Sequence, residues 1–86
     1  MKKMEKVLKA LGNQKRLEII WYLKQKKEAN VGSISEEIKI TFKATSKHLA
    51  ILSANNILGK NKRGLGVFYF LSQEQNPIAK YIISQI

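Results

Sequence analysis

The sequence lacks several features that would each point to a particular class of protein. It contains no cysteine, which excludes a disulfide scaffold and any site built on thiolates. Its longest unbroken apolar runs are five residues, whereas a membrane-spanning helix needs about 20. The N-terminus carries lysines with no apolar stretch behind them, unlike a secretory signal. These absences predict a soluble protein that stays in the cytoplasm.

Negative charge is absent from a long internal stretch. The 86 residues hold 16 Lys and Arg against 6 Asp and Glu, for a net charge of +10. The 36 residues 38–73 contain no acid and carry six cations: Lys39, Lys43, Lys47, Lys60, Lys62 and Arg63. A surface with spaced cations and no anions suits a polyanion, and nucleic acid is the commonest one in a cell.

The sequence also lacks the residue groups that catalysis or metal binding would need. His48 is the only histidine, no carboxylate lies near it in sequence, and no glycine-rich phosphate loop is present. One imidazole cannot build a tetrahedral zinc site. We therefore expect no enzyme, no catalytic residue, no cofactor and no metal site.

Apolar spacing predicts two helices in the first third of the chain. The first helix has one apolar face and ends at Gly12; that face holds Met4, Val7, Leu8 and Leu11. A second helix begins after Asn13, a favourable N-cap, and runs to about residue 27. Because apolar residues cover most of its circumference, we expect it to be central and contacted on several sides. Trp21 on this helix suits either the core or a dimer contact.

Two further helices follow, separated by only three residues. Ser33 and Glu36 match a capping box, which would open a short third helix at Ser33. Thr41 would cap a fourth helix over about residues 42–54, which Asn55 and Asn56 could end in a left-handed conformation. This spacing is typical of a helix-turn-helix, whose second helix enters the DNA major groove.

The last third predicts a β-hairpin and a fifth helix. Residues 58–63 and 66–71 have extended character around a glycine-containing turn. Asn76 followed by Pro77 is typical of a helix start, so the last helix should cover about residues 77–86. Ser72 with Gln75 offers an earlier start. The expected fold is therefore one mainly α domain over residues 1–86, with four helices, a small hairpin and a last helix.

The fourth helix has two different faces. Thr45, Leu49 and Leu52 would pack inward, and the opposite face is small or cationic: Lys43, Ser46, Lys47 and Ala50. Such a face can closely approach a major groove about 12 Å wide, where lysine contacts phosphates or guanine. The alternative is a merely solvated helix face. The acid-free surroundings and the cationic hairpin that follows favour nucleic acid.

Four stretches, residues 8–20, 44–52, 56–58 and 63–71, share the pattern of one known family. The most specific is the run Ser46-Lys47-His48-Leu49 after a short helix. On these stretches the chain resembles the ArsR family of winged helix-turn-helix repressors, over about residues 5–72. The resemblance implies that the fourth helix reads the major groove and that the hairpin is a wing touching the minor groove or phosphates.

The resemblance also assigns individual residues. The expected DNA contacts are Thr41, Phe42, Lys43, Ala44, Ser46, Lys47, His48, Lys60, Lys62, Arg63 and Gly64. A symmetric homodimer would pair the first and last helices through Met4, Leu8, Leu11, Ile78, Tyr81, Ile82 and Ile86, although these residues equally suit the core of one chain. Such a dimer would bind an inverted-repeat operator in double-stranded DNA.

The chain departs from the family pattern in ways that matter. Metal-sensing members use a cysteine pair or His and acidic ligands on the last helix, and this chain has neither, so we expect no metal sensing. Phe42 replaces a small polar residue and should pack against the turn, with thymine methyl contact as the alternative. We expect a partly buried, hydrogen-bonded His48, with phosphate contact as the alternative. We expect Arg16 to be a surface ion-pair partner, and a phosphate contact is the lesser alternative for it too.

The residues and the resemblance together predict a DNA-binding transcriptional repressor that acts by steric block. Two alternatives remain open. One is a winged-helix module that binds protein or RNA. The other is a membrane-surface protein that uses its basic N-terminus, although the apolar face of the first helix is short.

Overall fold

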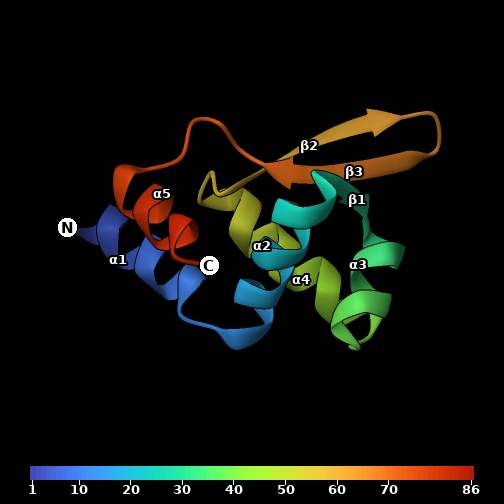
Figure 1. Ribbon diagram of the computed structural model, residues 1–86, viewed down its shortest axis with the longest axis horizontal. Coiled ribbons are helices and arrows are strands. Elements are labelled where there is room, and N and C mark those ends of the chain that lie inside the picture. Colours follow the sequence, from blue (N-terminus) through green and yellow to red (C-terminus); the bar gives the residue numbers. More distant parts are fainter.

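The chain forms five helices and three strands in this computed structural model, which describes all 86 residues (Figure 1). The elements are α1 (Lys2–Leu11), α2 (Gln14–Lys26), β1 (Glu28–Asn30), α3 (Val31–Ile38), α4 (Phe42–Ala54), β2 (Leu58–Arg63), β3 (Gly66–Leu71) and α5 (Pro77–Ser84). The winged helix-turn-helix order predicted from sequence is confirmed. One element, β1, was not predicted.

The core is built around α2, as expected. Ile19, Ile20 and Leu23 of this helix are fully or almost fully buried and pack with apolar side chains from every other helix. Burying one Ile or Leu side chain stabilises the fold by about 1.5–3 kcal/mol, so this helix carries much of the hydrophobic stabilisation. Trp21 departs from the expectation of an enclosed helix, because 47% of its surface remains exposed.

The three strands form one antiparallel sheet in the order β1-β3-β2, with β3 in the middle. Strand β1 pairs through Glu28 opposite Phe70 and Asn30 opposite Phe68. Its residues have low strand preference and it is only three residues long, so no sequence pattern marks it. The strand forms because β3 offers it an open edge. Its pairing ties the base of the hairpin to the start of α3.

Side-chain caps start most of the helices where the sequence predicts. Asn13, Thr41 and Asn76 each accept a hydrogen bond from the first turn of the following helix, and Pro77 is the first residue of α5. The alternative start of the last helix at Ser72 is therefore wrong. Asn56 takes a positive φ of 58° just after α4, which confirms the predicted helix stop.

The predicted capping box at Ser33 is wrong. The cap is Asn30, whose side-chain oxygen accepts from the Ser33 amide at 2.8 Å, and α3 begins at Val31. The physical reason is that Asn30 is the last residue of β1, so it already has the extended backbone that an N-cap needs. Ser33 lies inside the first turn.

The two ends of the molecule hold different elements (Figure 1). Helices α1 and α5 lie together at one end, near both chain termini, and they contact each other. The β2–β3 hairpin projects at the other end, beside α3. The fold thus separates the cationic hairpin from the α1–α5 surface.

Candidate nucleic-acid interface

Helix α4 presents the two faces that its sequence predicts. Thr45, Leu49 and Leu52 are fully buried against the rest of the fold. The Thr45 hydroxyl donates to the Thr41 carbonyl at 2.8 Å, so the one buried polar side chain of this face is satisfied. The opposite face is open to solvent, with Lys43, Lys47 and Ala50 exposed and Ala44 and Ser46 half-buried.

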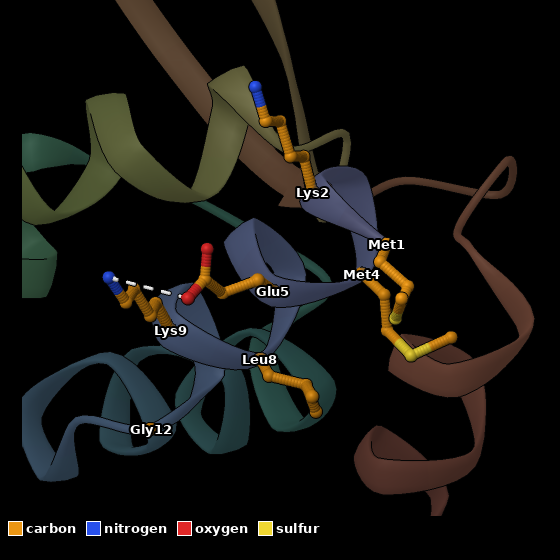
Figure 2. A pocket seen from close by; sticks show the side chains of 7 residues that line it. All are labelled: Met1, Lys2, Met4, Glu5, Leu8, Lys9 and Gly12. Atoms are coloured by element: carbon orange, nitrogen blue, oxygen red, sulfur yellow. Dashed lines mark ion pairs between the residues drawn. The ribbon is translucent and has the colours of Figure 1, made fainter.

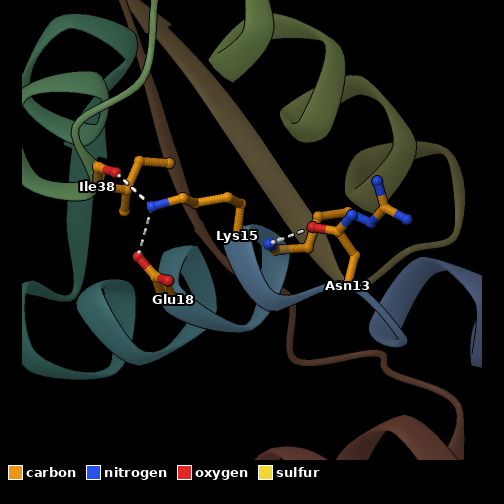
Figure 3. Close-up of polar contacts among 5 residues, drawn as sticks. Asn13, Lys15, Glu18 and Ile38 are labelled. Atoms are coloured by element: carbon orange, nitrogen blue, oxygen red, sulfur yellow. Dashed lines mark hydrogen bonds and ion pairs between the residues drawn. The ribbon is translucent and has the colours of Figure 1, made fainter.

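The start of α4 is held in place by the helices before it. Thr41 accepts from the Ala44 amide at 3.0 Å. Behind it, Lys15 of α2 donates to the Ile38 carbonyl at 2.9 Å and pairs with Glu18 at 3.3 Å (Figure 3). A cation at the last carbonyls of a helix is favoured by the helix dipole. These contacts fix the turn between α3 and α4 against α2.

The hairpin carries its cations on different faces. Because side chains alternate along a strand, Lys60 and Lys62 share the face of Val67, which stands opposite Lys62 in the register. Both lysines are exposed. Val67 lines an open groove together with Phe42 at the start of α4. Lys62 therefore lies on the hairpin face that borders the start of α4.

Arg63 lies on the other face of the hairpin. It forms an ion pair with Glu28 of β1, and its guanidinium carbon stands 4.2 Å from the centre of the Phe68 ring. Cation–π contact and ion pairing both hold this side chain against the sheet. The sequence placed Arg63 with the free cations of the wing, whereas the structure gives it two partners inside the chain. No local pattern could reveal this, because β1 was not predicted.

His48 faces inward toward Arg16. Its Nδ1 atom lies 3.1 Å from Arg16 Nη1, and the same guanidinium donates to the Ala10 carbonyl at 2.6 Å and the Lys9 carbonyl at 3.1 Å. Because arginine is always a donor, Nδ1 must accept, and the ring proton resides on Nε2. Burial and then the Arg16 charge lower the pKa of His48 below its ordinary value of 6.5.

These contacts settle two expectations. The prediction of a partly buried, hydrogen-bonded His48 is confirmed. The prediction that Arg16 is a surface ion-pair partner is wrong, because Arg16 instead caps the end of α1 and has no acid among its partners. The acceptors come from a helix end that the sequence alone cannot orient toward Arg16.

Phe42 does not pack against the turn, as the sequence analysis expected, because 61% of its surface is exposed. It borders an open groove of about 360 Å³ that runs from the start of α3 to the hairpin tip. Leu65 at that tip lines the same groove and is fully exposed. Sequence analysis missed Leu65, although a leucine between Gly64 and Gly66 at a hairpin apex has no core to join.

The α1–α5 end carries a second apolar surface. Met4, Leu8 and Tyr81 are exposed, and Ile78, Ile82 and Ile86 are half-buried. Met4 and Leu8 line an open hollow of about 660 Å³ along α1. Figure 2 shows these side chains together with the Glu5–Lys9 ion pair, whose residues line the same hollow. Leu11 differs from the other residues assigned to dimerisation, because it is 97% buried within the chain itself and leaves little surface for a partner.

Two further observations concern the whole chain. No group of three or more His, Cys, Asp or Glu side chains is placed where it could hold a metal ion together. None of the helices has both the length and the apolar character needed to cross a bilayer.

Known proteins share this sequence and this fold. A sequence model of the bacterial regulatory proteins of the ArsR family matches residues 13–60. The arsenical resistance operon repressor of Bacillus subtilis is 36% identical over 75 residues, which cover 87% of this chain and 71% of that protein.

Solved structures give the same result. HlyU from Vibrio cholerae superimposes with a TM-score of 0.80 at 32% identity, over 96% of this chain and 86% of that one. The homodimeric winged helix-turn-helix DNA-binding domain of Mb0332 from Mycobacterium bovis has the same fold, with a TM-score of 0.82 at 21% identity over 98% and 74% of the two chains. The chain belongs to the ArsR family of transcriptional regulators, which are not enzymes, and carries that family's winged helix-turn-helix DNA-binding domain.

Proposed function

We propose that this chain is a sequence-specific regulator that binds double-stranded DNA through α4 and the β2–β3 wing. The observation that carries this is the open outer face of α4, where Lys43 and Lys47 are exposed in a segment without acids. The proposed contacts are Thr41, Phe42, Lys43, Ala44, Ser46, Lys47, His48, Lys60, Lys62 and Gly64. We leave Arg63 out, because its partners are Glu28 and Phe68.

The contacts divide by what they can recognise. Small side chains such as Ala44 and Ser46 let the helix approach base edges, and Lys43 and Lys47 reach guanine or phosphates. Lys60 and Lys62 have flexible charged ends that suit phosphates. With Nδ1 of His48 facing Arg16, only its Nε2–H remains to donate to a phosphate.

The regulator acts in this proposal as a homodimer on an inverted-repeat operator. A second copy would cover the exposed apolar side chains of the α1–α5 end, chiefly Met4, Leu8 and Tyr81. A two-fold axis there would set the two recognition helices about 34 Å apart, one turn of the duplex. Leu11 contributes to this surface only by supporting α1 from the core.

The proposed mode of regulation is repression in the cytoplasm, by a dimer that occupies a promoter and excludes polymerase. The relative in Bacillus subtilis is a repressor, whereas HlyU of Vibrio cholerae is a transcriptional activator. The match to HlyU covers 63% of that protein's length. We also propose that this regulator senses no metal. Its only histidine faces Arg16, and α5 contains no His, Asp, Glu or Cys.

The experiment is a titration of fluorescent duplex DNA with the purified protein over a range of salt concentrations. Each phosphate engaged should contribute about −0.9 to the slope of log affinity against log salt. A flat salt response would overturn the proposal. Tighter binding to structured RNA than to any duplex enriched from a random pool would favour the alternative, a winged-helix module for RNA.

Single substitutions should separate the two kinds of contact. Lys47→Ala should lower affinity and also blur the sequence preference, because it removes a side chain that can reach base edges. Lys62→Ala should weaken all duplexes alike and reduce the salt slope by about 1. The opposite pattern would mean that the wing reads sequence and α4 does not.

A further inference from the structure

The tip of the wing is apolar. Leu65 stands at the apex with its side chain fully exposed. The turn is open around it, because a Cβ added to Gly64 would meet no atom within 4 Å. Gly64 has a φ of +61° and Leu65 does not have a positive φ, which is the pattern of a type II′ hairpin turn. This tight turn holds Leu65 beyond the last paired residues, Arg63 and Gly66.

No cation of the hairpin occupies the apex in place of Leu65. Arg63 is directed to Glu28 and Phe68 on the outer face of the sheet. That ion pair joins the end of β2 to β1, so it braces the hairpin near its tip. Lys62 lies on the opposite face. The only side chain at the apex is therefore the apolar one of Leu65.

The surroundings of Leu65 favour a duplex as its occupant. The groove it shares with Phe42 is lined by Asn30, Val31, Gly32, Gly66 and Val67 and has no acid. Two exposed lysines adjoin residues that line the groove: Lys43 follows Phe42 in α4, and Lys62 stands opposite Val67 in the hairpin register. An apolar tip amid cations and without anions is complementary to DNA, whose bases are apolar on their faces and whose backbone is negative.

We propose that Leu65 acts as an apolar wedge that enters the minor groove beside the half-site and partly unstacks one base step. Leucine is among the side chains that proteins insert between base pairs, with kinks of about 20–90° toward the major groove. The wedge would favour pyrimidine–purine steps, because these unstack most easily. Arg63 then serves as a positioning residue that keeps the hairpin from bending away. This proposal rests on the proposed DNA binding of α4 and the wing.

The first test selects duplexes from a randomised pool with the unmodified protein, Leu65→Ser and Leu65→Met. Serine suits the second position of this turn and removes the apolar bulk, whereas methionine retains it. The unmodified protein and Leu65→Met should enrich a half-site with a TA or CA step at a fixed distance beside it. Leu65→Ser should enrich the same half-site without that step. Enrichment of the step by Leu65→Ser would overturn the wedge.

The second test measures bending and affinity on the duplex that the unmodified protein enriches. Energy transfer between dyes at the two duplex ends should report a bend that Leu65→Ser loses, with about a tenfold weaker affinity. The salt slope should not change, because no phosphate contact is removed. Equal bending and affinity for Leu65→Ser would refute the wedge alone. Failure of the unmodified protein to enrich any duplex would refute the proposed function as well.

One control addresses a protein occupant of the groove. Sedimentation of Leu65→Ser without DNA should give the same mass as the unmodified protein. A smaller mass would mean that a second copy covers the wing tip, and the wedge would be overturned.

Discussion

The guanidinium of Arg16 joins two parts of the fold that are remote in sequence. It donates to two carbonyls at the end of α1 and faces His48 on α4. The planar guanidinium has several donors in fixed directions, so it can donate to acceptors that lie on different sides of it. The compact ammonium of lysine cannot replace this arrangement. Arg16 thus adds a polar link between α1 and α4 to the apolar packing of the core.

Replacing Arg16 should therefore destabilise the protein more than replacing an exposed cation of the same helix. Arg16→Ala should lower the free energy of unfolding by about 2 kcal/mol, because hydrogen bonds from a charged donor are lost and carbonyls lose a partner. Arg16→Lys should recover only part of this. Urea unfolding followed by circular dichroism measures the change. Lys26→Ala, an exposed cation on the same helix, is the control and should change stability by less than about 0.5 kcal/mol. Equal effects of the two alanine variants would contradict the role of Arg16.

His48 should make stability depend on pH. Its folded pKa lies below 6.5 because burial and the Arg16 charge disfavour the protonated ring. The unfolded state then binds more protons between the folded pKa and 6.5, so stability rises with pH through that window. The contribution is fully present above about pH 6.5 and is lost as the pH falls through the folded pKa.

The urea midpoint should accordingly fall as the pH decreases from about 7 to 5. Histidine is the only type of side chain whose ordinary pKa lies in this range, and His48 is the only histidine of the chain. His48→Gln keeps a polar side chain that does not titrate, so the urea midpoint of this variant should depend less on pH. A midpoint that rises on acidification, or a His48→Gln curve as steep as that of the unmodified protein, would show that the ring is not held neutral.

At the scale of elements, α2 organises the other helices through its cations as well as its core residues. Lys15, Arg16 and Lys24 each donate to carbonyls in the last turn of a different helix, α3, α1 and α5 respectively. Cations there complement the helix dipole. No local sequence pattern predicts the contact of Lys24, because the carbonyl it reaches, that of Ile83, is 59 residues away in the chain.

This contact shows what the sequence could and could not predict. Apolar periodicity and the caps at Asn13, Thr41 and Asn76 are local signals, so the helices and the two faces of α4 were predicted with nearly correct bounds. Strand β1, the Arg63–Glu28 pair and the contacts of Arg16 require partners far away in the sequence. The exposure of Phe42 and Leu65 likewise depends on how the hairpin stands beside α4. The elements that form the candidate site were therefore predictable from sequence, whereas the partners of their individual side chains were not.

A side chain added at Gly59 in the wing would collide with a ring on the neighbouring strand. A Cβ on Gly59 of β2 would lie 2.6 Å from the Phe70 ring on β3, whereas a Cβ on Gly32 in α3 would have no atom nearer than 3.6 Å. Gly59→Ala should thus lower stability by about 1–3 kcal/mol through overpacking. Gly32→Ala is the matched control and should raise stability by up to about 1 kcal/mol, because alanine favours a helix. Thermal unfolding of both variants tests this. A neutral Gly59→Ala would mean that the Phe70 ring moves aside at little cost.

At the scale of the whole molecule, the fold places two surfaces at opposite ends (Figure 1). The wing end is cationic with an apolar tip, and the α1–α5 end exposes the apolar side chains of Met4, Leu8 and Tyr81 beside the lysines of α1. In the proposed function, this separation would let one chain engage a partner copy and a duplex at the same time. It also lets a substitution at one end test its surface without touching the other.

The decisive variant for the dimer surface is Leu8→Lys. Leu8 is 45% exposed on α1, and a lysine there would place an unpaired cation in the proposed interface. Sedimentation should show monomers, and affinity for an inverted-repeat duplex should fall while single half-sites bind as before. The added positive charge by itself strengthens attraction to DNA, so a weaker affinity cannot be a charge effect.

Trp21→Lys is the matched control, since Trp21 is 47% exposed on α2, and it should remain a dimer. If Trp21→Lys dissociates and Leu8→Lys does not, the copies meet through α2, and the two recognition helices would be spaced by a different axis.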